Sequence, residues 1–268
     1  MVIDEILADL EAENDDLDGL VSGISAEQWR LPTPAPGWTI AHQISHLTST
    51  AAIATLAATD AGAFAARRAE LGKGFNEATD AGAAEFADSP PEQLLERWRD
   101  TRSALQDALA AVPAGQRLPW IVTPVSPATM ASIRLMELFG HGQDIADALG
   151  VERPATDRLV HVAWFGVRTR DYAFVNRGLA VPAGEFDVKL VAPGGGEWRW
   201  GPGDAAQSVS GPGLDFCLLV TQRRHRDDLS LVASGPDADR WLDIAQAYAG
   251  PPGPGRAPGQ FAAAKPAK

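Results

Sequence analysis

The chain has 268 residues, of which 45% are hydrophobic, so it can bury the core of one or two domains, and disorder of the whole chain is excluded. Its formal net charge of −12 would repel phosphate backbones and anionic lipid, which carry the same sign, so we expect neither a nucleic acid nor a membrane as a partner. The single cysteine excludes an intramolecular disulfide, and the lack of a basic signal segment or a long apolar run predicts a cytoplasmic protein.

The first 178 residues carry the periodicity of helices. Apolar residues between Ile3 and Val21 recur at spacings of three and four, which is typical of one face of an amphipathic helix. Caps, prolines and stop glycines bound the later helices, which we expect at Thr39 to about Thr59, Ser89 to Val112, Ser126 to Gly150 and Thr156 to Gly178. We therefore predict a helical bundle over residues 1–178.

The pattern changes after Gly178. Phe186, Val188 and Leu190 alternate with polar residues, as Trp198 and Trp200 do after a turn, so we predict a β-hairpin. A short helix, a strand and a last helix follow, at Leu214 to Gln222, Leu229 to Ala233 and Ala238 to Ala249. We predict a small α+β domain at 179–250 and, from its Pro-, Gly- and Ala-rich composition, a disordered tail at 251–268.

The helix that follows Ser126 places ionisable groups on an apolar face. Glu137, His141 and Asp144 share one sector of this helix with Met130 and Ile133. Burying such groups costs several kcal/mol each unless they are paired or bind a cation. Glu137 and His141 stand four residues apart, so both can reach one ion. The alternative is an ordinary surface pair, which the apolar neighbours disfavour.

A third metal ligand is expected from the helix that begins near Trp38. His42 and His46 are the candidates there, and periodicity does not choose between them. We expect Asp144 to support a ligand rather than to bind the ion. Two histidines and one glutamate leave coordination positions open, which is typical of a catalytic site, and zinc is the divalent ion we expect, although iron, nickel and manganese suit the same ligands.

Two stretches resemble a known family. The sequence from Gly37 to Leu47, GWTIAHQISHL, and that from Glu137 to Ile145, ELFGHGQDI, are similar to the mycothiol-dependent maleylpyruvate isomerase family of the DinB-like metal-binding superfamily. The resemblance implies a mainly α, α+β fold, in which a DinB-like antiparallel four-helix bundle precedes a small α/β domain similar to sterol-carrier folds. It also implies that His46, directly before a leucine, binds the ion with Glu137 and His141, and that mycothiol is the thiol cosubstrate.

The run from Gln222 to Arg226 is a local cationic cluster in an acidic chain. It suits either a solvated loop or a clamp for the carboxylates of a substrate or thiol cofactor. In the second interpretation Arg223 is the candidate catalytic and cofactor-binding residue, and Trp38 lines the cofactor pocket. The family often carries glycine where this chain has Gln222. Cys217 stands in an apolar run and is expected to be a buried, inert thiol.

These features predict a metal-dependent isomerase or thiol transferase of the maleylpyruvate isomerase type. Its divalent ion would activate a low-molecular-weight thiol for isomerisation of, or addition to, a small electrophilic substrate. Two alternatives stay open: a thiol-independent isomerase or hydrolase that uses the same metal, and a non-catalytic protein that binds a metal and a small ligand. We expect a small-molecule substrate as partner, and a monomer or homodimer.

Overall fold

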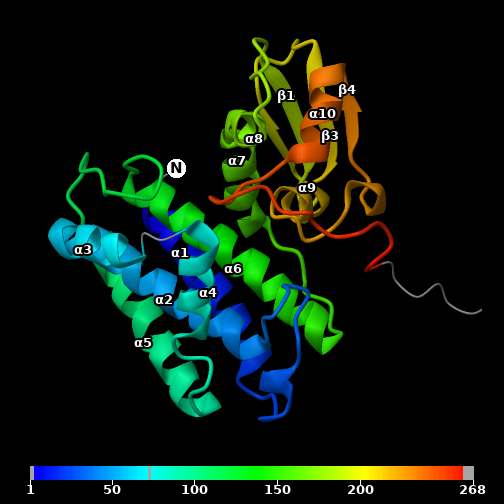
Figure 1. Ribbon diagram of the computed structural model, residues 1–268. Coiled ribbons are helices and arrows are strands. Elements are labelled where there is room, and N and C mark those ends of the chain that lie inside the picture. The colour runs from blue at the N-terminus through cyan, green and yellow to red at the C-terminus, as the bar shows by residue number, and fades with distance from the viewer. Residues whose placement is uncertain (1–2, 72–73, 262–268) are drawn as a thin grey trace, which may run out of the picture. The chain divides into compact units, whose positions relative to one another are not determined.

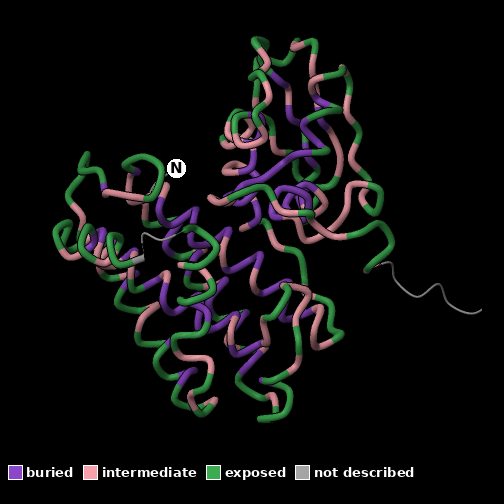
Figure 2. The backbone as a smooth tube through the Cα atoms, in the orientation of Figure 1, coloured by how far each residue is buried: buried purple, intermediate pink, exposed green. Residues whose placement is uncertain are grey.

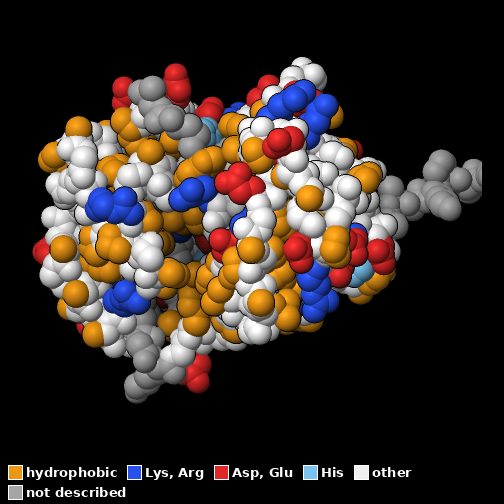
Figure 3. Space-filling model, turned by 90° about the horizontal axis from the view of Figure 1, so that it is seen from above, with side chains coloured by type: hydrophobic (Ala, Val, Ile, Leu, Met, Phe, Trp, Pro, Cys, Tyr) orange, Lys and Arg blue, Asp and Glu red, His pale blue; other side chains and the backbone are white. Residues whose placement is uncertain are grey.

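The structure is a computed structural model that describes residues 3–71 and 74–261 (Figure 1). The chain divides into two compact units, here called the first unit, Met1–Arg153, and the second unit, Pro154–Lys268. Within the described residues, no helix combines the length and the apolar character that crossing a membrane requires. In the view of Figure 3, acidic, basic and apolar side chains are interspersed on the same face.

Four long helices build the first unit: α1 (Ile3–Val21), α2 (Ile40–Thr59), α5 (Pro91–Ala110) and α6 (Pro127–Leu149). α1 packs against α5 and α6, and α2 packs against the same two helices, so the four close into the bundle that the sequence predicted. Two shorter helices, α3 (Ala61–Leu71) and α4 (Phe75–Ala84), connect α2 to α5 and pack against α2, and a 3-10 turn (Gln28–Arg30) precedes α2.

Local signals explain where the long helices run. The apolar stripe of α1 is buried, as Figure 2 shows for the inner faces of the bundle, and Asn14 fits within it because its amide donates to the carbonyl of Leu10 at 2.9 Å. At the start of α6 the hydroxyl of Ser126 accepts a hydrogen bond from the backbone N–H of Thr129 at 3.1 Å. The same helix ends at Gly150, whose φ of 66° is the left-handed conformation that glycine favours.

The second unit contains one four-stranded sheet and short helices. The strands β1 (Phe186–Val191), β2 (Glu197–Trp200), β3 (Gln207–Pro212) and β4 (Val232–Ser234) lie in the order β2-β1-β3-β4. β1 and β3 are parallel and the two outer pairs are antiparallel, which confirms the predicted hairpin of β1 and β2. The helices are α7 (Val160–Arg168), α8 (Arg170–Asn176), α9 (Gly213–Val220) and α10 (Pro236–Ile244), with 3-10 turns at Asp157–Leu159 and Arg226–Asp228.

The division between the units differs from the boundary expected at 178. The predicted helix from Thr156 to Gly178 is a 3-10 turn followed by α7 and α8, which pack against α9 and α10 of the second unit. Gly166 permits this packing, because a Cβ atom there would lie within 3.1 Å of Phe216 and Val220. The last predicted helix also ends early, at Ile244 instead of Ala249.

The predicted tail is described in part. Residues 262–268 lie outside the described residues, whereas residues 251–261 have contacts within the second unit. The backbone N–H of Gly259 donates to the carboxylate of Asp228 at 2.8 and 3.0 Å. The guanidinium of Arg224 lies over the ring of Phe261, 4.3 Å from its centroid. The first part of the tail therefore follows the surface of the folded second unit.

Candidate metal centre

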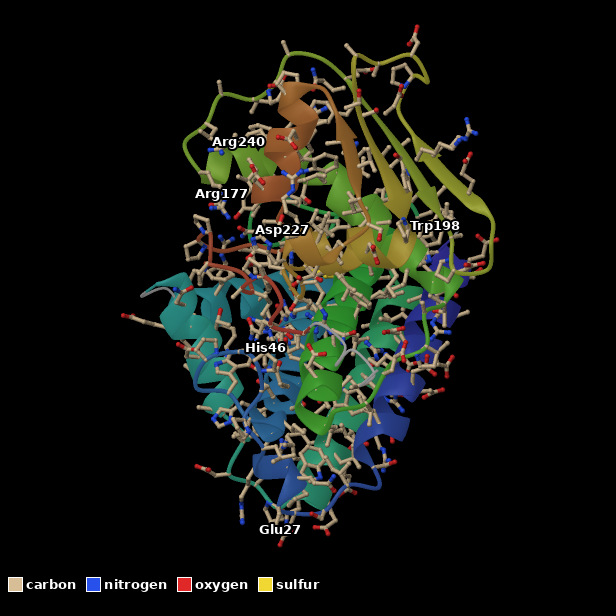
Figure 4. All side chains as sticks on the ribbon, turned by 90° about the vertical axis from the view of Figure 1, so that its right-hand side faces the viewer. Glu27, His46, Arg177, Trp198, Asp227 and Arg240 are labelled. Carbon is tan, nitrogen blue, oxygen red and sulfur yellow. The ribbon has the colours of Figure 1, made fainter. Side chains whose placement is uncertain are left out.

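Three side chains of the first unit converge on one point between two helices. α2 supplies His46, and α6 supplies Glu137 and His141. Nε2 of His46 lies 3.5 Å from Oε2 of Glu137, and Nε2 of His141 lies 3.2 Å from the same oxygen. One donor atom from each residue lies within 4.8 Å of the other two. Figure 4 labels His46 on α2, within the bundle.

Glu137 is the anionic member of this cluster. Burial alone would raise its pKa, but hydrogen bonds from His141 and His46, together with the positive charges of His141 and Arg134, hold the pKa of Glu137 well below its ordinary value. Glu137 is therefore a carboxylate at neutral pH. His46 is only 6% exposed, and Glu137 and His141 are half-buried, so the negative charge is largely shielded from solvent.

A chain of hydrogen bonds determines which nitrogen of His141 carries the proton. The hydroxyl of Thr33 donates to the carbonyl of Trp38 at 2.9 Å, so it accepts from the Gln43 amide, whose Nε2 lies 2.8 Å away. The Gln43 oxygen consequently faces Nδ1 of His141 at 2.5 Å and accepts its proton. Gln43 thus keeps a proton on Nδ1, and Nε2 is the nitrogen that faces Glu137: it carries a proton in the charged imidazole, and it would offer its lone pair where a metal ion replaces that proton.

This donor set fits a divalent metal ion. Two imidazole nitrogens and one carboxylate oxygen are ligands that zinc and its neighbours accept. Nε2 of His141 lies 3.2 Å from a carboxylate oxygen of Glu137, and a metal ion could take the place of the proton that these two atoms share. Three protein ligands leave further coordination positions for a small molecule.

Trp38 forms one side of the cluster. Its ring is stacked on that of His141, with centroids 5.9 Å apart and an interplanar angle of 14°, and its centroid lies 5.1 Å from that of His46. The indole Nε1–H donates to Asp80 of α4 at 3.0 Å, which holds the ring in place. Trp38 therefore lies beside two of the candidate metal ligands, and its place in a cofactor pocket stays a prediction.

His42, the alternative to His46, has another role. Its Nδ1 lies 2.8 Å from the hydroxyl of Thr39 and 3.4 Å from the backbone N–H of the same residue, so it caps the first turn of α2. Asp144 is buried, 1% exposed, further along α6 and does not belong to the cluster. The structure therefore brings His46, and not His42, to Glu137 and His141.

Two residues near the cluster were not singled out from the sequence. Gln43 stands one turn before His46, a spacing that could have identified it as a support for a ligand. Arg134 stands one turn before Glu137 and is 4% exposed, with its guanidinium donating to the hydroxyl of Thr50 at 2.9 Å. Burial lowers the pKa of Arg134, and the charge of Glu137 opposes this shift.

Arg223 belongs to the second unit and follows the end of α9. Its backbone N–H donates to the carbonyl of Leu218 at 2.8 Å, and that of Gln222 donates to Leu219 at 2.9 Å, which together form a Schellman motif. Gln222 has a φ of 57°, the left-handed conformation that explains why glycine suits this position. A guanidinium nitrogen of Arg223 donates to the carbonyl of Thr221 at 2.5 Å.

A four-helix bundle with a His–Glu–His cluster, followed by a small α/β unit, defines a two-unit protein with a candidate metal site. The chain belongs to the family of the mycothiol maleylpyruvate isomerase N-terminal domain, whose family model matches residues 10–146. A second family model, described as wyosine base formation, matches residues 194–234. The first match contains all three residues of the cluster.

Similar proteins extend over most of the chain. Two relatives from Mycobacterium tuberculosis, the uncharacterized proteins MT0041 (strain CDC 1551 / Oshkosh) and Rv0036c (strain ATCC 25618 / H37Rv), are each 54% identical over 250 residues, which cover 93% of this chain and 97% of theirs. Crystal structures of the mycothiol-dependent maleylpyruvate isomerase and its H52A mutant have TM-scores of 0.57 and 0.59 at 15% identity, covering 88% of this chain and 96% of theirs. The likeness to these two structures confirms the fold.

Proposed function

We propose that this protein is a metal-dependent enzyme that binds a divalent ion through His46, Glu137 and His141. Zinc is the ion that we propose. The observation that carries the proposal is the convergence of two imidazole Nε2 atoms on one carboxylate oxygen, at 3.2 and 3.5 Å. When bound, the ion would act as a Lewis acid and lower the pKa of a coordinated thiol or water.

The side chains around the cluster support this role. Gln43 accepts the Nδ1 proton of His141, so Nε2 is the nitrogen available to a metal, and Glu137 stays anionic because its pKa is held low. The ring of Trp38 covers one side of the two histidines and would limit the access of water to a bound substrate. We assign Trp38 to the pocket for the thiol cosubstrate.

The thiol in the proposed reaction comes from outside the protein. Cys217, the single cysteine of the chain, is fully buried in the second unit, where its Sγ lies 3.5 Å from the carbonyl of Leu159. We propose mycothiol as the cosubstrate, in keeping with the family. The proposed substrate is a small electrophile, which is either isomerised or converted to a stable adduct with the thiol. Arg223 is proposed to bind a carboxylate of the substrate or of the thiol, and the reducing cytoplasm is the proposed location.

The test combines metal content with turnover. Wild-type protein and the variants His46→Ala, Glu137→Gln and His141→Ala would be compared with the control His42→Ala, which changes a histidine of the same helix outside the cluster. We expect about one zinc per chain in wild type and control, and at least tenfold weaker zinc binding in the three variants. Maleylpyruvate turnover should require both mycothiol and metal; full turnover by metal-free protein would overturn the proposal.

A further inference from the structure

The second unit contains a pocket of about 120 Å³ in which basic side chains gather. Its lining includes four arginines and one histidine, which come from three separate segments of the chain: Arg177, Arg224, His225, Arg226 and Arg256. Asp243 is the single carboxylate among the described lining residues. In a chain with a net charge of −12, such a concentration of cations at one point requires a physical reason.

Two of these side chains lie at ion-pair distance from carboxylates of the second unit: His225, whose Nδ1 is 3.5 Å from Asp227, and Arg226. Arg226 pairs with Asp243 at 2.6 Å and with Asp239 at 2.8 Å, so the carboxylate of the pocket is already engaged. Arg177 differs, because its Nε is buried and has no hydrogen-bond partner among the described residues. A guanidinium stays protonated at all physiological pH values, so a buried donor of this kind is costly unless an acceptor from outside binds it.

Apolar side chains and the start of the tail complete the walls. Leu219 of α9 and Leu242 of α10 contribute apolar surface, and residues 253–256 form another side. This segment is held at both ends: the hydroxyl of Tyr172 donates to the carbonyl of Gly250 at 3.2 Å, and Gly259 is bound to Asp228. The proline- and glycine-rich segment therefore forms one side of the pocket without helix or strand.

We propose that this pocket binds a small molecule with an oxyanion group, a carboxylate or a phosphate, and that Arg177 is its principal contact. The planar guanidinium matches both groups in geometry and charge, and the leucines suit a short apolar body. Sites for drug-sized ligands measure about 300–1,000 Å³, so the ligand is smaller than these. All lining residues belong to the second unit, whereas the three candidate metal ligands belong to the first, and Arg223 is not among the lining residues.

The test uses inorganic phosphate and succinate, titrated calorimetrically into the full-length protein at 0.15 M NaCl. The variant Arg177→Gln is compared with Arg240→Gln, which removes an exposed arginine of α10 outside the pocket lining; Figure 4 labels both positions. We expect saturable binding of at least one anion at one site per chain, weakened at least tenfold by Arg177→Gln and less than twofold by the control. Binding of phosphate alone identifies a phosphate ester as the ligand class, and binding of succinate alone identifies a carboxylate.

Two further variants keep the result unambiguous. If Arg177→Gln does not fold, as judged by circular dichroism, Arg256→Gln, which changes another arginine of the lining, takes its place in the comparison. His141→Ala, which impairs the proposed metal centre, should bind the anion like wild type. Absence of binding of both anions, equal binding by the pocket variant and wild type, or loss of binding in His141→Ala would each overturn the proposal.

Discussion

The carboxamide oxygen of Gln43 lies 2.5 Å from Nδ1 of His141 and thereby joins α2 to α6 beside the candidate metal site. Because Gln43 stands one turn before His46, the helix that supplies one candidate ligand also orients another. The amide nitrogen of Gln43 is held in turn by Thr33, in the loop before α2. A short loop, α2 and α6 are therefore connected through a single side chain at the point where an ion would bind.

Replacing Gln43 with leucine should weaken metal binding without removing a ligand. The substitution keeps a similar volume but removes the acceptor for the Nδ1 proton, so His141 loses its preferred tautomer and orientation. Losses of such supporting contacts weaken metal binding by about 10–100-fold, and we expect that range for zinc, measured by competition with a chromophoric chelator. Gln93→Leu, at an exposed position of α5, is the matched control, and an unchanged affinity in Gln43→Leu would contradict the tautomer assignment.

Cys217 should be inert towards thiol reagents in the folded protein. Its side chain has no exposed surface, and it lies in the core of the second unit. We expect a bulky disulfide reagent to label no cysteine under native conditions and one per chain after unfolding in urea. Cys217→Ala should retain thiol-dependent turnover and lose about 1 kcal/mol of stability, a typical value for point substitutions. Rapid native labelling with loss of turnover would contradict the need for an external thiol.

The parts of the fold that could be predicted are those that depend on local chemistry. The bounds of α6 follow from Ser126, Pro127 and Gly150. At the ends of a helix some backbone N–H and C=O groups have no partner within the helix, and these three residues either bind such a group or lack it. The pair of Glu137 and His141 follows from the same helix, because residues four apart project to one point. None of these inferences required knowledge of what the helix packs against.

The features that local patterns could not supply depend on contacts between distant segments. Nothing local distinguishes His46 from His42 as a ligand, because the choice depends on which side of α2 meets α6; the resemblance to a family supplied it. β3 was not expected as a strand, since its parallel pairing with β1 requires a crossover through β2. The break between α7 and α8 at Thr169, whose hydroxyl donates to the carbonyl of Phe165 at 3.0 Å, also has only a weak local signal.

The stability of the first unit should depend on Asp18 at neutral pH but not in acid. The hydrogen bonds of Arg99, at 2.7 and 2.5 Å, lower the pKa of Asp18 below 3.8; burial opposes this shift, and the charges of Arg99 and Arg102 add to it. The pKa of Asp18 is lower in the folded protein than in the unfolded protein. The stabilisation that ionised Asp18 contributes is therefore complete above about pH 4 and is lost as the pH falls through the pKa of the folded state.

Asp18→Asn is therefore expected to lower the free energy of unfolding by about 1 kcal/mol at pH 7, the upper range for partly exposed ion pairs. The difference from wild type should shrink as the pH falls below 4, where the wild-type carboxyl also becomes neutral. Urea titrations at pH 7, 5 and 3 measure this effect. Asp88→Asn, at an exposed position of the same unit, should change little at any pH, and a constant difference for Asp18→Asn across the range would refute the linkage.

Gln222 allows a direct measurement of backbone strain beside Arg223. Its φ of 57° is left-handed, and its side chain also accepts a hydrogen bond from the hydroxyl of Tyr248 and donates to the carbonyl of Ala245. Gln222→Gly and Gln222→Val both lose these two hydrogen bonds, so the difference between them isolates the backbone conformation. We expect the valine variant to be less stable than the glycine variant by about 1–2 kcal/mol, measured by urea unfolding of the whole chain. Equal stabilities would mean that the turn after α9 adopts another conformation in solution, and the position of Arg223 would then have to be revised.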